Sequence, residues 1–507
     1  MKNHIHQYRQ VANFVIAFVL TFLGVKAEAS AQQDSVSSPP IINISTPNGI
    51  SWSDSLCLAY FNITYPNGES FSSSIGIKFH GGSSLSFPKR SFRIEFWADE
   101  SGNMTEDHAL LGMRSDDDWF LLAAYNEPLR VRSLTCYDLW REIHKPYYHT
   151  MEPNAQSCVH MDYAELYLND SYYGIYLVAE KVDRKLLKLK PFDGNIHGEL
   201  YKGKDLGATT FESVPENYDN SQTIMDGFEY QYPNEIIDWS HLYEFLDFVV
   251  NSSDDDFHAE IAHRVQIDNM IDYFIFFNTI NAIDNTGKNI YLARYKDNEP
   301  YFFVPWDLDA SLGNYFDGTP WPEFTGILSN GLFDRLIRDK EPDGFCTKVM
   351  QRWNELRGTT LSHQHIMELY QAHVNFMKNN GLYEKEHLAW PEFSYDSTQI
   401  DYVSEWLENR LSWLGNYIET LGIEEQGANE QLFGLYPNPA TSQISIFSAS
   451  PIERISIAKV DGRIVRQIES MADQTTATLQ LNGIQPGMYI VTVRSNASQS
   501  SLKLIVQ

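Results

Sequence analysis

The stretch from Asn278 to Gly313 places the strongest constraint on the fold, because it joins a helix pattern directly to a strand pattern. Residues 265–283, which lead into it, are apolar on nearly every side and predict a buried helix. The runs IYLAR and YFFVPW follow, separated by an Asp-Asn pair that is typical of a turn, and predict a β-hairpin. We therefore expect an α+β domain in which this helix and hairpin share a core.

Acidic and amide side chains flank the predicted hairpin. Asp284 and Asn289 lie five residues apart in the loop before it, and Asp307 and Asp309 follow its second strand. Protein kinases use an acid, an amide and a second acid in this order to orient the acceptor hydroxyl and hold a metal on the nucleotide phosphates. If the strand continued, Asp307 and Asp309 would lie on one face, where their repulsion suggests a cation. The alternative is an ordinary loop, since Asp and Asn bond their own backbone there.

Length and charge exclude some classes of function. A chain of 507 residues with 43% hydrophobic and 14% aromatic residues is too long for one core and too apolar to be disordered, so we expect two or three domains. The formal net charge of −29 argues against a nucleic-acid partner, which requires clustered Lys and Arg. A nucleotide ligand would need a metal or a local basic patch to offset the same charge.

The beginning of the chain resembles a secretory signal. Residues 1–31 hold a basic head, an apolar run at residues 11–25 and the small-residue string AEASAQ, with cleavage expected after Ala31. The apolar run is too short to predict a membrane span, and no other candidate span follows it. Four cysteines suit an oxidising compartment, share no zinc-type spacing and leave three disulfide pairings open: Cys57, Cys136, Cys158 and Cys346.

The remaining patterns divide the chain into four regions. Residues 41–183 alternate and turn like strands and predict a β-rich lobe, whereas residues 194–234 are polar and predict a long lid or loop. Residues 235–421 predict a helical lobe. After a composition break near residue 425, residues 430–507 show short, evenly spaced strands and predict a small all-β sandwich without a catalytic cluster.

A glycine- and serine-rich turn interrupts the predicted β-rich lobe. The segment GGSSLSFPKR lies between the strand patterns SIGIKFH and SFRIEFW. Its backbone N–H groups, with Ser83 and Ser84, could cradle a phosphate, and Lys89 and Arg93 would supply positive charge nearby. Such turns are usually only turns, because this one lacks the spacing of an established phosphate-binding loop.

Five ordered segments between residues 41 and 421 together resemble the CotH (spore coat protein H) kinase family. They are GIKFHGGSSLSFPKRSFRIEF, DWFLLAAYNEPLRVRSLTCYDLW, ELYLNDSYYGIYLVAEKVDR, IDYFIFFNTINAIDNTGKNIYL and VPWDLDASLG. The resemblance implies an atypical, protein-kinase-like, two-lobed domain over residues 32–425. It also implies transfer of the γ-phosphate of ATP to protein Ser or Thr with Mg or Mn, although the acceptor protein is not identified.

The resemblance assigns roles to particular residues. It implies Asp284 as the catalytic acid and Asn289 and Asp307 as metal ligands, and we expect Asp309 to support the metal or a water at the same site. Nucleotide binding would fall to the glycine-serine turn and its basic neighbours: Ser83, Ser84, Lys89 and Arg93. A catalytically inactive surface binding or adhesion protein of the same family stays open as the alternative.

The end of the chain resembles a second known module. The motifs YPNP, DGR, GMYIV and KLIV, in this order, are similar to the type A sorting domain of the type IX secretion route in Bacteroidetes. This resemblance implies the type IX secretion machinery as a partner. It also implies a protein that is secreted or held at the outer cell surface.

Overall fold

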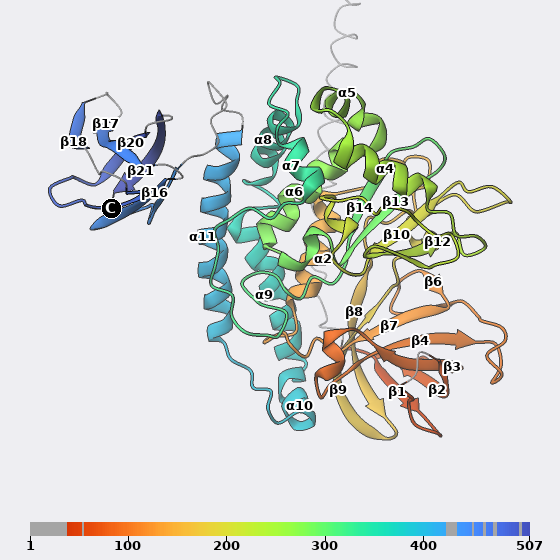
Figure 1. Ribbon diagram of the computed structural model, residues 1–507. Helices are drawn as coiled ribbons and strands as arrows, with labels where there is room; N and C mark the ends of the chain where they lie inside the picture. The colour runs from red at the N-terminus through yellow and green to blue at the C-terminus, as the bar shows by residue number, and fades with distance from the viewer. Residues whose placement is uncertain are drawn as a thin grey trace, which may run out of the picture. The chain divides into compact units, whose positions relative to one another are not determined.

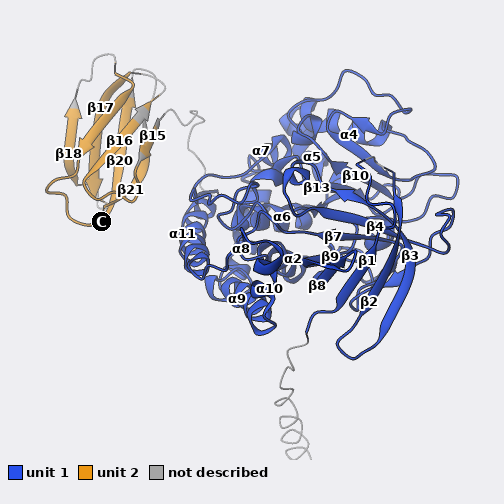
Figure 2. Cartoon of the chain, turned by 90° about the horizontal axis from the view of Figure 1, so that it is seen from below, with its two compact units in different colours: residues 1–423 blue, residues 424–507 orange. Residues whose placement is uncertain are grey.

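The computed structural model describes residues 38–52, 55–421, 433–448, 451–459, 463–469, 474–495 and 499–506. The predicted signal segment at residues 1–31 lies outside them. The chain divides into two compact units, residues 1–423 and 424–507, shown in different colours in Figure 2. Within the described ranges, no helix is both long and apolar enough to cross a membrane.

The first unit begins with a closed barrel of strands in the order β1-β2-β3-β4-β7-β9-β8. Strand β1 pairs in parallel with β8, and the other neighbours are antiparallel. Alternate side chains point inward, as the burial of Ile42 and Ile44 on β1 shows, and they fill a core of the barrel's own. The strands are β1 (Ile41–Ser45), β2 (Cys57–Thr64), β3 (Ser70–His80), β4 (Ser91–Trp97), β7 (Asp118–Leu122), β8 (Met161–Leu168) and β9 (Ser171–Ala179).

A second sheet has the order β11-β12-β10-β13-β14. The predicted hairpin forms its edge as β13 (Ile290–Arg294) and β14 (Tyr301–Pro305), which confirms that prediction. The prediction of a lid or loop at residues 194–234 is wrong, because this segment supplies β10 (Glu199–Gly203), β11 (Ile224–Met225) and β12 (Phe228–Tyr232). Alternating buried side chains on β12 fix it to the core despite the polar composition.

Helices cover the rest of the first unit, and Figure 1 shows them beside the barrel. The predicted buried helix is α6 (Ile267–Ile280), which is buried continuously from Asn269 to Ile280. Helix α2 (Arg132–Ile143) leaves the barrel and packs against α6 and α9. The others are α3 (Arg184–Leu187), α4 (Ser240–Asn251), α5 (Asp254–Arg264), α7 (Gly331–Leu336), α8 (Phe345–Leu356), α9 (His363–Asn379), α10 (Leu382–Ala389) and α11 (Thr398–Leu421).

These elements confirm a mixed α and β structure, while the two-lobed kinase-like arrangement stays a prediction. All four cysteines lie in described residues and are free, so none of the three possible disulfide pairings is formed. Cys136 on α2 and Cys346 on α8 are instead buried thiols in separate helices.

The second unit is all-β, as predicted. Its sheets have the orders β15-β16-β19 and β18-β17-β20-β21. Apolar residues of both sheets, including Ile446 and Val491, form one buried cluster. The strands are β15 (Phe433–Tyr436), β16 (Gln443–Ser448), β17 (Ile452–Lys459), β18 (Ile464–Glu469), β19 (Thr476–Gln480), β20 (Gly487–Ser495) and β21 (Gln499–Val506).

Candidate active site

A cavity of about 610 Å³ is lined by the barrel, the second sheet and the loop that follows α6. It has room for a ligand of nucleotide size, since ligand pockets commonly measure about 300–1,000 Å³. Its lining includes every residue that the sequence analysis assigned to a site: Ser83, Ser84, Lys89, Arg93, Asp284, Asn289, Asp307 and Asp309. The fold therefore brings residues separated by more than 200 positions to one place.

The loop after α6 is held rigidly against β10. It begins with a short 3₁₀ helix at Ile283–Thr286, in which Asp284 is half-buried. Asn285 is buried, and its Nδ2 donates to the carbonyl oxygens of Asn289 and Trp306, each at 2.8 Å. The backbone nitrogen of Asn289 donates to the Gly203 carbonyl at 2.9 Å. These bonds tie the loop to β10 and to the end of β14.

Asn285 offers a test of this support. We expect Asn285→Ala to lower the free energy of unfolding by about 1–3 kcal/mol, because it removes both donors from buried carbonyl oxygens. Urea denaturation measures the change. Asn409→Ala, at an exposed position on α11, is the matched control and should change stability by less than about 0.5 kcal/mol. Equal stabilities of the two variants would contradict the supporting role.

Asp307 and Asp309 are placed by backbone geometry that differs from the expected continuous strand. Strand β14 ends at Pro305, and Asp307 has φ of +55°, so strand alternation does not set their direction. The backbone nitrogen of Asp307 donates to Tyr137 Oη on α2 at 3.0 Å. Asn126 Nδ2 donates to Asp309 Oδ2 at 2.6 Å. Two residues from another part of the chain therefore fix the position of the acids.

The carboxylates of the cavity repel one another. Desolvation by the surrounding protein, then the charges of Asp309 and Asp284, raise the pKa of Asp307 above its ordinary value, although its side chain is exposed to solvent. Burial also raises the pKa of Asp309. A divalent cation would relieve this repulsion, and the carboxylate and amide oxygens of Asp307, Asp309 and Asn289 are ligands that Mg and Mn prefer. These side chains therefore offer the donor types that the implied metal takes.

Lys89 has a different environment from the one predicted for a phosphate-binding cation. It is 1% exposed, and its Nζ donates to Glu386 Oε1 and to the Ile175 carbonyl, each at 2.6 Å. Arg130 also contacts Glu386, at 3.2 Å. The Lys89 ammonium is therefore already neutralised and hydrogen-bonded by α10 and β9.

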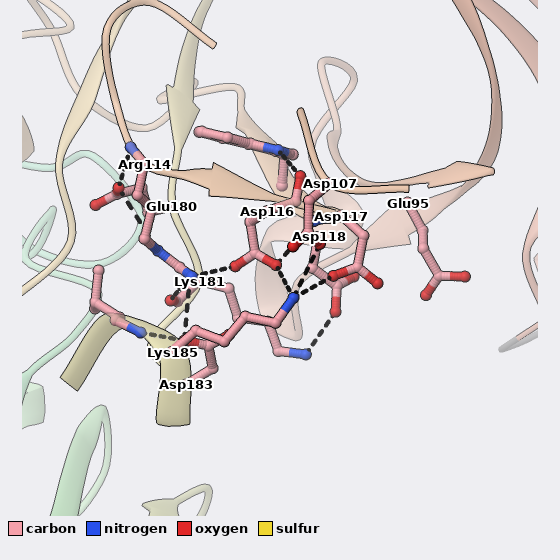
Figure 3. A network of polar contacts seen from close by, with 12 residues as sticks. Glu95, Asp107, Arg114, Asp116, Asp117, Asp118, Glu180, Lys181, Asp183 and Lys185 are labelled. Atoms are coloured by element: carbon pink, nitrogen blue, oxygen red, sulfur yellow. Dashed lines mark hydrogen bonds and ion pairs between the residues drawn. The ribbon is translucent and has the colours of Figure 1, made fainter. Parts of the chain in front are cut away.

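Arg93 and Lys181 both pair with Asp118, and Figure 3 shows Lys181 and Asp118 within an acidic network. Arg93 contacts Asp118 at 2.6 Å and Glu95 at 3.0 Å, and Lys181 contacts Asp118 at 2.8 Å. Three further acids could suit a metal, but Lys185 Nζ lies 3.0–3.1 Å from all of them: Asp107, Asp116 and Asp117. The ammonium takes the place of a cation there, and none of these four residues lines the cavity.

Several residues that line the cavity were not singled out by the sequence analysis. Lys202, Lys204, Glu229 and Gln231 come from β10 and β12 or directly follow them, in the segment predicted to be a lid. The alternation in ELYKG and FEYQY was the available signal. The others come from elsewhere in the first unit and include Asn126, Tyr137, Lys181 and Lys288.

Comparison with known proteins identifies both parts of the chain. A family model described as "CotH kinase protein" matches residues 77–414, and one described as "Secretion system C-terminal sorting domain" matches residues 434–507. Inner spore coat protein H of Bacillus subtilis (strain 168) is 23% identical over 352 residues, which cover 68% of this chain and 88% of that protein.

Among solved structures, the chain matches "Twitchin kinase region from C. elegans" weakly. That match has 11% identity and a TM-score of 0.17 over 94% of each chain, values too low to inform the fold. The family matches carry the assignment, because the first spans more than half of the sequence. The chain therefore belongs to the CotH kinase protein family and ends in a secretion-system C-terminal sorting domain.

Proposed function

We propose that this protein is an exported, metal-dependent kinase that transfers the γ-phosphoryl group of ATP to a Ser or Thr hydroxyl of another protein. The observation that carries the proposal is the cavity itself, which gathers acids and cations in a chain of net charge −29. Its lining includes Asp284, Asn289, Asp307 and Asp309 together with basic residues: Lys78, Arg93, Lys181, Lys202, Lys204 and Lys288. Such a mixture suits a polyphosphate with its metal.

The proposed chemistry assigns each side chain a task. Asn289, Asp307 and Asp309 hold Mg or Mn, and the bound cation offsets the negative charge of the phosphates. Asp284 orients the acceptor hydroxyl and takes its proton as the oxygen bonds to the γ-phosphorus. The bond from that phosphorus to the bridging oxygen breaks, and ADP leaves. In this proposal the barrel and the helical region correspond to the two lobes of an atypical kinase.

The site of action follows from the C-terminal unit. A secretion-system sorting domain supports export, to the medium or to the cell surface. We assign the export to the type IX machinery, on the strength of the YPNP, DGR and GMYIV motifs. The acceptor protein would then be met outside the cell or on its surface.

Thermal unfolding tests the proposal most directly. ATP with Mn²⁺ should raise the melting temperature, because a ligand at 100 times its dissociation constant stabilises the folded state by about 2.7 kcal/mol. ATP with a chelator is the control and should give a much smaller rise. Incubation with γ-labelled ATP and an acceptor protein should then transfer the label to Ser or Thr residues of that acceptor. Absence of a metal-dependent rise in the folded protein would overturn the proposal and favour a binding or adhesion role.

A further inference from the structure

We propose that Lys202 supplies the ammonium that binds the phosphate chain in the cavity, the role that the sequence analysis gave to Lys89 or Arg93. The inference rests on the proposed function and makes it more specific. It adds a residue of the second sheet to a site otherwise built from the barrel and from the loops around β13 and β14.

The other cations of the cavity are mostly engaged by protein acids. Each of four has a carboxylate oxygen within 3.2 Å: Lys89 with Glu386, Arg93 with Asp118, Lys181 with Asp118 and Lys204 with Glu229. A phosphate that recruited one of these groups would compete with an existing ion pair. If a phosphate recruited Lys89, the fully buried carboxylate of Glu386 would also lose part of its ion pair with Lys89.

Lys202 stands in a different position. It is half-buried and lines the cavity, and its side-chain ammonium makes no hydrogen bond or ion pair with any residue that the structure describes. Lys202 lies directly across from Tyr291 in the pairing of β10 with β13. Its Nζ lies 5.8 Å from the ring centre of Tyr291 and 6.0 Å from that of Trp306. The rings confine the ammonium while leaving its three donors available.

The charges around Lys202 place it beside the acids of the cavity. The Lys202 ammonium and the carboxylates of Glu229 and Asp307 attract one another, and Glu229 lies opposite Lys202 in the pairing of β10 with β12. Burial lowers the pKa of Lys202 itself; the charges of Glu229 and Asp307 oppose this effect, and those of Lys204 and Lys181 add to it. An anion held between this ammonium and a cation on Asp307 would offset that desolvation. A phosphate chain is an anion of this kind, because it binds ammonium and metal at neighbouring oxygens.

Calorimetric titration of the full chain with Mn²⁺-ATP and with Mn²⁺-tripolyphosphate tests the inference. We expect Lys202→Met to lower the affinity for both ligands by about tenfold to a hundredfold, the loss typical of a charge-assisted hydrogen bond. Lys202→Arg should recover most of the affinity, which loss of packing alone would not allow. Lys296→Met is the matched control, since the Lys296 side chain is 42% accessible to solvent and lies outside the cavity, and this variant should bind both ligands like the wild type.

The outcomes separate this inference from the proposed function. If Lys202→Met binds both ligands as the wild type does, or if the loss follows Lys288→Met or Lys89→Met instead, the assignment of Lys202 is overturned and the kinase proposal is unaffected. If tripolyphosphate binding depends on Lys202 but no labelled phosphate reaches any acceptor, the phosphate site stands and the kinase proposal falls. If the folded wild type binds neither ligand, both fall.

Discussion

Asp307→Ala should abolish the metal-dependent stabilisation by ATP, whereas Asp284→Ala should retain it and lose phosphate transfer. Asp307 supplies a central carboxylate of the proposed metal set, so its removal leaves Asp309 and Asn289 with too few oxygens for a tight site. Asp284 acts on the acceptor hydroxyl, and the loss of such a base lowers turnover by about 10²–10⁴-fold. Thermal shift with Mn²⁺-ATP and a labelled-phosphate assay measure the two effects separately.

The apo protein provides a check on the Asp307 variant. Desolvation and the like charges of Asp309 and Asp284 disfavour the ionised form of Asp307. Removing this charge should therefore leave the ligand-free melting temperature unchanged or higher, which separates loss of metal from loss of fold. Asp247→Ala, on the exposed side of α4, is the matched control and should behave like the wild type in both assays. If Asp307→Ala and Asp284→Ala transferred labelled phosphate as well as the wild type does, these roles would be refuted.

Lys89→Met should lower the free energy of unfolding by about 3–5 kcal/mol. The side chains of Lys89 and Glu386 are both inaccessible to solvent, so the substitution leaves a buried carboxylate without its closest partner. Arg130 still contacts Glu386, which places the expected loss toward the lower end of this range. Urea denaturation, with the denaturant dependence checked for a single transition, gives the value.

Two comparisons make the Lys89 prediction specific. The double variant Lys89→Met with Glu386→Gln should recover part of the lost stability, because it removes the stranded charge. Affinity of the folded Lys89→Met protein for Mn²⁺-ATP should stay within about twofold of the wild type. A stable Lys89→Met protein that has lost its affinity for the nucleotide would instead support the phosphate-binding role predicted from sequence.

Local sequence predicted much of the architecture. The continuous apolar run of α6 and the Asp-Asn turn between β13 and β14 are properties of neighbouring residues, and both elements were predicted correctly. The all-β C-terminal unit followed in the same way from its evenly spaced strands. The β10 and β12 strands were missed because their polar side chains and glycine-rich surroundings concealed a short alternation.

The chemical types available to the site were also determined by the sequence: acids and an amide around one hairpin, and basic residues after a glycine-serine turn. Which of these cations is available to a ligand was decided only by tertiary structure. Lys89 meets Glu386, which lies 297 residues away in the chain, whereas Lys202 lies beside two aromatic rings and forms no ion pair with any residue in the described ranges. A charge is neutralised by whichever opposite charge the fold brings within a few ångströms of it. Local sequence does not determine the distance between two groups that lie far apart in the chain.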